Sequence, residues 1–201
     1  MPSYRQTFPN SCGAASLMCA AIEIGVPAIP ANPAIHPLWV GGHLMPALGD
    51  RPSEIMIYAV TSGVPGAPNN DTGYSLPSKI GKAARALGLS TIAFVPKSIT
   101  GAILLFLYGN EVLDAQSVGM LVTRKEAPLP VGNQRLLKIL RVGDAAGWLP
   151  ATGLHYVMMR PDMSIMDPAV GQDFPNLDMA IQAHRANGTF YQDTGLAILI
   201  A

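Results

Sequence analysis

The chain has 201 residues, of which 49% are hydrophobic and 13% charged, and its formal net charge is zero. This length suits one domain spanning residues 1–201, with enough apolar residues for a sizeable core. A neutral charge balance argues against a nucleic-acid or anionic-membrane partner, because either would require a basic patch. We therefore expect no nucleic acid and no membrane among the partners.

The N-terminus carries no sign of a secretory signal peptide. Its first residues, Met-Pro-Ser-Tyr-Arg, lack an apolar core. The longest uncharged apolar run, residues 99–108, is about half a membrane span in length. The sequence predicts a cytoplasmic protein, or one exported by a route other than the Sec pathway.

The first half of the chain predicts helices separated by irregular segments. Residues 11–25 predict a helix that Asn10 or Ser11 caps and Gly25 ends. It is apolar nearly all round, as is typical of a buried central helix. We expect irregular chain over 26–52, a helix over 53–61 capped by Ser53, an amphipathic helix over 76–87, a strand over 90–95 and a buried helix over 98–108.

The second half predicts mainly strands. The patterns favour strands over 118–123, 136–142, 154–160, 164–166 and 196–200, with one helix over 176–185. Helices mostly first and strands mostly later indicate an α+β fold with an antiparallel sheet.

Two cysteines are present, Cys12 and Cys19. On one helix their Cα atoms would lie about 10 Å apart, too far for a disulfide, so we expect free thiols. Cys12 falls in the first turn, where unpaired N–H groups and the helix dipole favour thiolate over thiol. Cys19 lies mid-helix between apolar neighbours and is expected in the core. Simple burial is also the alternative for Cys12, because cysteine is often buried.

A nucleophilic cysteine requires a base, and His155 has the most suitable surroundings of the four histidines. The pattern from residue 153 to 171 predicts a hairpin that turns at Pro161-Asp162 and stops at Asp167-Pro168. Such a hairpin would return Asp167 to the side of His155, where its carboxylate can orient the imidazole.

Four further residues are candidates for the site. The Gln6 amide could donate to an oxyanion, together with the N–H of Cys12. Gly13 has no side chain where a substrate would approach the backbone. Trp39 and Trp148 lie in loops and are candidates to wall a substrate groove, although loop aromatics more often anchor the loop.

The remaining histidines do not indicate a metal site. His36 and His43 are seven residues apart in a proline-rich loop with no cysteine nearby, which is poor support for zinc binding. His184 falls near a helix C-terminus, where a partial positive charge is favourable. We expect no metal and no cofactor.

Two motifs carry a resemblance to a known family. Gln6-x5-Cys12-Gly13-x-Ala15-x-Leu17 resembles the active-site start of papain-like cysteine peptidases, above all the bacteriocin-processing C39 and C39-like peptidases. The second motif comprises His155-Tyr156-Val157 and Asp167-Pro168-Ala169-Val170-Gly171.

The resemblance implies Cys12 as nucleophile, His155 as general base, Asp167 as its orienter and Gln6 as oxyanion donor. It also implies a papain-like fold, with a central catalytic helix in a helical N-terminal half and an antiparallel sheet in the C-terminal half. The Cys-Gly-Ser-Cys-Trp run of the papain and cathepsin branch is absent, so substrate specificity does not carry over.

Three functions are compatible with these residues. The first is a cysteine peptidase acting on a protein or peptide. The second is a glutamine deamidase or transamidase of the bacterial effector type, using the same three residues. The third is a non-catalytic peptide-binding module, which the presence of Cys12 disfavours because C39-like domains that only bind lack the cysteine. The substrate and the oligomeric state stay open.

Overall fold

The computed structural model describes residues 4–44, 51–97, 110–144 and 153–201. Five helices lie in these ranges: α1 (Cys12–Ile24), α2 (Arg51–Ser62), α3 (Pro77–Ala86), α5 (Glu111–Ser117) and α6 (Leu177–Ala186). The strands there are β1 (Ala28–Ile29), β2 (Gly42–His43), β3 (Thr91–Phe94), β4 (Leu121–Thr123), β5 (Arg135–Asp144), β6 (Gly153–Met159), β7 (Ile165–Asp167), β8 (Gln172–Phe174) and β9 (Thr189–Ile200). The helix predicted over 98–108 lies outside the described residues.

Helix α1 is the central helix that the sequence predicts. Ten consecutive residues from Cys12 to Ala21 are buried. Gly25 ends the helix in the left-handed conformation, with φ 102°, and its N–H donates to the carbonyls of Ala21 and Ile22. A helix buried all round has to lie between other layers of the fold, and this fixes where its first turn can lie.

Seven strands form one sheet in the order β4-β3-β9-β5-β6-β7-β8. The pairing is antiparallel except between β3 and β4, which run parallel. The expectation of a purely antiparallel sheet is therefore wrong at this edge. A parallel neighbour requires a crossover connection, and helix α5, which is not among the predicted elements, precedes β4 in that crossover.

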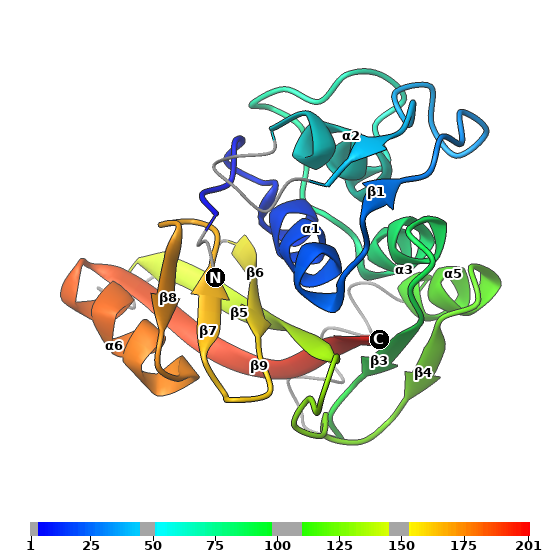
Figure 1. Cartoon of the computed structure of the whole chain (residues 1–201). Coiled ribbons are helices and arrows are strands. Elements are labelled where there is room, and N and C mark those ends of the chain that lie inside the picture. Colours follow the sequence, from blue (N-terminus) through cyan, green and yellow to red (C-terminus); the bar gives the residue numbers. More distant parts are fainter. Residues whose placement is uncertain (1–3, 45–50, 98–109, 145–152) are drawn as a thin grey trace.

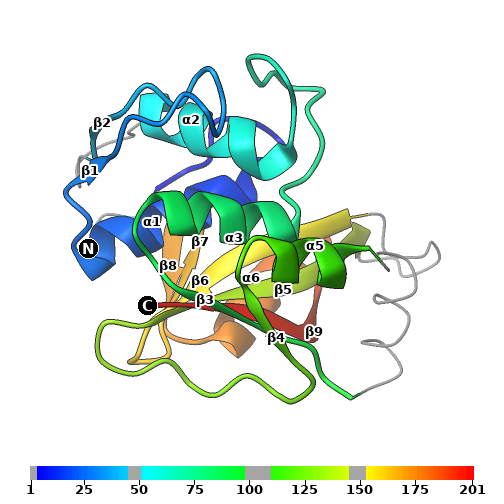
Figure 2. The same ribbon diagram turned by 90° about the vertical axis from the view of Figure 1, so that its right-hand side faces the viewer.

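Two layers of apolar side chains cover the sheet. Alternate residues such as Leu137, Ile139, Tyr156 and Met158 pack with α1, α2 and α3. Their neighbours on the strands, including Leu136 and Val157, pack with Ala180 of α6. Figures 1 and 2 show these three helices on one side of the sheet and α6 on the other. The arrangement is a mixed fold consistent with α+β.

Several boundaries differ from the sequence prediction. Helix α2 begins at Arg51, so Ser53 lies inside it and does not cap it. Two short strands, β1 and β2, pair within the segment 26–52 that was expected to be irregular. Strand β9 starts seven residues before the predicted strand, because its N-terminal part pairs with β5 beyond an irregularity between Lys138 and Leu140. Long-range pairing of this kind leaves little local signal.

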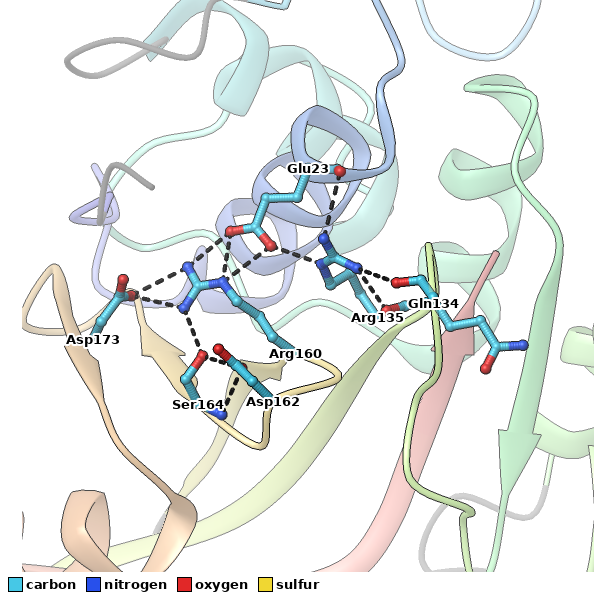
Figure 3. Close-up of polar contacts among 8 residues, drawn as sticks. Glu23, Gln134, Arg135, Arg160, Asp162, Ser164 and Asp173 are labelled. Atoms are coloured by element: carbon cyan, nitrogen blue, oxygen red, sulfur yellow. Dashed lines mark hydrogen bonds and ion pairs between the residues drawn. The ribbon is translucent and has the colours of Figure 1, made fainter.

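A buried ion cluster fastens the C-terminal end of α1 to the sheet (Figure 3). Glu23 pairs with Arg135 of β5 at 2.7 Å and with Arg160 at 2.8 Å, and these three side chains are 6–8% exposed. Arg160, which directly follows β6, also pairs with Asp173 of β8 at 3.2 Å. The two guanidinium groups lie at the C-terminus of α1, so they neutralise the charge of Glu23 and also complement the negative end of the helix dipole.

None of the helices in the described parts of the chain is long and apolar enough to cross a membrane.

Candidate active site

Cys12 is the first residue of α1, and only 2% of its surface is exposed. Ser11 occupies the N-cap position, yet its side chain makes no capping hydrogen bond to the helix. Its hydroxyl contacts Glu54 and the backbone of Phe8. The first-turn N–H groups of α1 are therefore not satisfied by the usual cap, and they can stabilise negative charge at this helix end.

The Cys12 sulfur lies against an open stretch of strand β6. Pairing of β6 with β7 covers only Met158 with Met166 and Met159 with Ile165. The Tyr156 N–H is not used by β7 and donates to Cys12 Sγ at 3.5 Å. The thiol thus reaches the backbone of the strand that carries His155.

The hairpin that the sequence predicts is present. Its turn is closed by the Arg160 N–H donating to the Ser164 carbonyl at 2.9 Å. His155 Nε2 lies 2.8 Å from Oδ1 of Asp167, and both side chains are buried. Since Nε2 faces Asp167, the other ring nitrogen stays available to exchange a proton with Cys12, whose charge acts on the imidazole.

Charge shapes the protonation of this pair. Burial alone lowers the pKa of His155, but the charge of Cys12 and hydrogen bonds to Asp167 and Cys12 outweigh it and raise the pKa to about 10. Burial would raise the pKa of Asp167, yet hydrogen bonds from His155 and His184 hold it well below its usual range. An imidazolium beside a carboxylate is the favoured state at neutral pH.

Glu54 of α2 organises the segment that leads into Cys12, a role that is not evident from the sequence. This carboxylate is fully buried and accepts hydrogen bonds from the Tyr4 hydroxyl at 2.6 Å and the Thr7 N–H at 3.0 Å. The hydroxyls of Thr7 and Ser11 donate to it as well. A glutamate in an amphipathic helix gives no sequence signal of such a role.

Gln6 lies beside the site, but its side chain points elsewhere. Its backbone N–H donates to the carbonyl of Pro168, directly after Asp167, at 2.8 Å. Its Nε2 donates to the carbonyls of Phe8 and Pro9, both at 2.8 Å, so both amide hydrogens are engaged. Among the described residues its Oε1 is buried and has no partner. In this structure Gln6 does not present a free donor toward Cys12.

The two substrate-binding candidates that the structure describes have other roles. A Cβ on Gly13 would lie 2.5 Å from the Cβ of Ser75, so this glycine lets α1 approach another part of the chain. Trp39 is fully buried and its Nε1 donates to the Pro30 carbonyl at 2.8 Å. Trp39 anchors its loop and does not wall a groove, so that prediction is wrong, whereas substrate approach at Gly13 stays a prediction. Trp148 lies outside the described residues.

The other thiol and a loop histidine behave as expected. Both cysteines are free. Burial raises the pKa of Cys19 to about 12, aided by the charge of Glu23, as befits a core residue. Nε2 of His36 lies 2.9 Å from the Val64 carbonyl oxygen, and its Nδ1 accepts a hydrogen bond from the Leu38 N–H. These contacts stabilise the loop. Within the described ranges no cluster of three potential ligands could hold a metal ion.

His184 makes a contact that the sequence did not reveal. It lies in the last turn of α6, as predicted, and its Nε2 is 2.7 Å from Oδ2 of Asp167. Nothing in the spacing of 17 residues between them indicates this contact.

An apolar pocket lies near the site. It lies between the helical layer and strands β3 and β9, and its lining includes Ser75, Leu154, Tyr156, Phe94 and Ile198. Ser75 approaches Gly13, and Tyr156 contacts Cys12. Ser75 and Tyr156 therefore connect the lining of the pocket to the start of α1.

Comparisons with known proteins define the class. The model of a family described as Invasion plasmid antigen J, cysteine protease, matches residues 4–201. The chain is 34% identical over 204 residues to the cysteine protease IpaJ of Shigella flexneri, an alignment that covers 98% of this chain and 76% of that protein. No solved structure matches the chain significantly. The protein is a cysteine peptidase. More particularly, the chain belongs to the IpaJ cysteine protease family.

This family assignment refines the resemblance seen in the sequence. A papain-like cysteine peptidase is supported, whereas particular closeness to the C39 family is not confirmed. The deamidase alternative gains no support from these relatives.

Proposed function

We propose that the chain cleaves peptide bonds through Cys12, His155 and Asp167. The observation that carries this proposal is the meeting of two elements. The uncapped first turn of α1 places the Cys12 sulfur on strand β6, and the adjacent residue of that strand, His155, is buried against Asp167. These contacts support the assignment of residues 12, 155 and 167 as nucleophile, base and orienter, the arrangement that activated thiols require.

The proposed reaction starts from a thiolate–imidazolium pair. The Cys12 thiolate attacks the carbonyl carbon of the scissile bond, and the electron pair moves to the carbonyl oxygen. The His155 imidazolium protonates the leaving amine, which departs and leaves a thioester on Cys12. Neutral His155 then removes a proton from water, the resulting hydroxide cleaves the thioester, and the acid product and the thiolate are released.

The backbone N–H of Cys12 is the primary donor to the oxyanion in this scheme, because it belongs to the first turn of α1 and has no acceptor within the helix. For Gln6 to assist, one of its N–H groups must leave the carbonyl of Phe8 or Pro9. Gln6 is therefore proposed as an oxyanion donor only after its side chain rearranges on substrate binding.

The substrate is proposed to be a protein or peptide, because the Shigella relative is named a cysteine protease. The same three residues could hydrolyse a glutamine side-chain amide, but no observation favours that reaction over cleavage.

The test is cleavage of a proteome-derived peptide library, read by labelling new N-termini and by mass spectrometry. The wild-type chain should create new termini, whereas Cys12→Ala and His155→Ala should create almost none. Cys19→Ala, a matched loss of a buried thiol in the same helix, should leave cleavage intact. New termini at an undiminished rate with Cys12→Ala would refute the proposal, and products heavier by about one dalton with intact chains would indicate deamidation.

A further inference from the structure

The carboxylate of Asp167 lies between two imidazole rings. Oδ1 is 2.8 Å from Nε2 of His155, and Oδ2 is 2.7 Å from Nε2 of His184. Asp167 is fully buried, and the two histidines are 6% and 7% exposed. The mechanism above uses only one of these two histidines.

The ring of His184 is held in place by aromatic neighbours from two strands. It stacks on Tyr191 of β9, with ring centroids 3.9 Å apart and an interplanar angle of 17°. Phe174 of β8 lies 6.1 Å from it, centroid to centroid. Tyr191 also lies 5.4 Å from the ring of His155, so one aromatic side chain contacts both imidazoles.

The hydrogen bonds around Asp167 leave its carboxylate little freedom to turn. The Ala169 N–H donates to Oδ1 at 2.9 Å, and the two histidines contact one oxygen each. The donors therefore come from strand β6, from the turn after β7 and from helix α6. Without His184, Oδ2 would lose the only side-chain donor that the described residues give it, and Asp167 itself has no exposure to water that could replace that donor.

We propose that His184 is a positioning residue of the active site, which donates to Oδ2 and holds Asp167 so that Oδ1 faces His155. This proposal rests on the proposed function, because it gives His184 a part in stabilising the imidazolium that pairs with the Cys12 thiolate. His184 does not touch the reacting atoms. It acts through the carboxylate, as an outer hydrogen-bonding partner fixes the group that it contacts.

The test compares two substitutions of this one side chain. His184→Phe keeps a flat ring on Tyr191 but removes the donor, whereas His184→Gln keeps an amide donor. The readout is the rate of Cys12 alkylation by iodoacetamide between pH 4 and pH 10, together with thermal unfolding. Among the described residues, the titratable groups that contact His184 are Asp167 and Tyr191, both of which also contact His155, and all three are unchanged in both variants.

A weaker hold on Asp167 makes the imidazolium, and with it the thiolate, less stable. We expect His184→Phe to move the midpoint of the alkylation profile to higher pH and to slow alkylation at pH 6 at least tenfold. His184→Gln should restore most of the midpoint. His36→Gln, which removes another buried histidine from a loop remote in sequence, should not shift it.

The proposal is overturned if His184→Phe keeps the wild-type midpoint, or if His184→Gln shifts it as far as His184→Phe does. If His184→Phe does not fold, the test is the change in the ¹⁵N chemical shifts of the histidine side chains between the wild type and Asp167→Asn. Both the His155 and His184 signals should move and that of His36 should not, and an unmoved His184 signal overturns the proposal. The proposed function fails separately, if His155→Ala leaves the Cys12 profile unchanged.

Discussion

Ser11, the residue at the N-cap of the helix that begins with Cys12, directs its hydroxyl to Glu54 and not to the helix. A serine in this position ordinarily accepts a hydrogen bond from an N–H group of the first turn. Here Glu54 binds it together with Tyr4 and Thr7. In the proposed mechanism, this leaves the helix start available to the thiolate and to an oxyanion, while a carboxylate from α2 holds the segment that leads into Cys12.

Glu54→Gln should destabilise the protein and slow the reaction of Cys12. The amide nitrogen of glutamine cannot accept the hydrogen bonds that the carboxylate accepts, so buried donors lose their partner at a cost of about 1–3 kcal/mol each. We expect a lower free energy of unfolding in urea and slower alkylation of Cys12 at equal folded fraction.

Glu111→Gln is the matched control for this substitution. Glu111 accepts hydrogen bonds from Ser78 but is only half-buried, so the effect should be smaller. The role given to Glu54 would be contradicted if both variants lost the same free energy of unfolding, or if Glu54→Gln kept the wild-type stability and alkylation rate.

Cys12 should react with iodoacetamide at pH 7 at least tenfold faster than Cys19. Accessibility does not favour this outcome, because Cys12 is 2% and Cys19 6% exposed. The difference has to come from thiolate stabilisation by the helix start and His155, whereas burial raises the pKa of Cys19 to about 12. Peptide mass spectrometry measures both rates, and His155→Ala should remove most of the difference. Equally slow rates at both thiols in the wild type would contradict the assignment of Cys12 as nucleophile.

The stability of the protein should decline at alkaline pH because of His155. Its folded pKa, raised to about 10, lies above the ordinary value of 6.5. Its contribution to stability is therefore fully present below pH 6.5 and is lost as the pH rises through about 10. The free energy of unfolding, measured in urea at pH 6.5, 8 and 9.5, should fall more steeply for the wild type than for His155→Gln. Parallel curves for the two proteins would show that the folded state does not favour the imidazolium.

Glu23→Gln should cost about 3–5 kcal/mol of unfolding free energy, because Arg135 and Arg160 would keep buried charges without their shared partner. Asp173→Asn is the matched control: its side chain is 35% exposed, and its loss should cost less than about 1 kcal/mol. Urea unfolding measures both. The same free energy in the two variants would show that the cluster in Figure 3 does not fasten α1 to the sheet.

The sequence by itself determined the features that depend on neighbouring residues. The apolar run after Ser11 and the glycine at residue 25 define α1, and strand periodicity with the turn at Pro161-Asp162 defines the hairpin. Because a hairpin folds its own two strands together, the closeness of His155 and Asp167 followed from local pattern alone.

Only the tertiary structure decided the contacts between distant segments. Asp167 meets His184 across 17 residues, Ser11 meets Glu54 across 43, and Glu23 meets Arg160 across 137. It also buried Trp39 and turned the amide of Gln6 toward Phe8 and Pro9. Glutamates, histidines and tryptophans occur on many surfaces and in many cores, so their types carry no partner information. Their partners are set by how the helical layers and α6 pack on the sheet, and that packing depends on the whole chain.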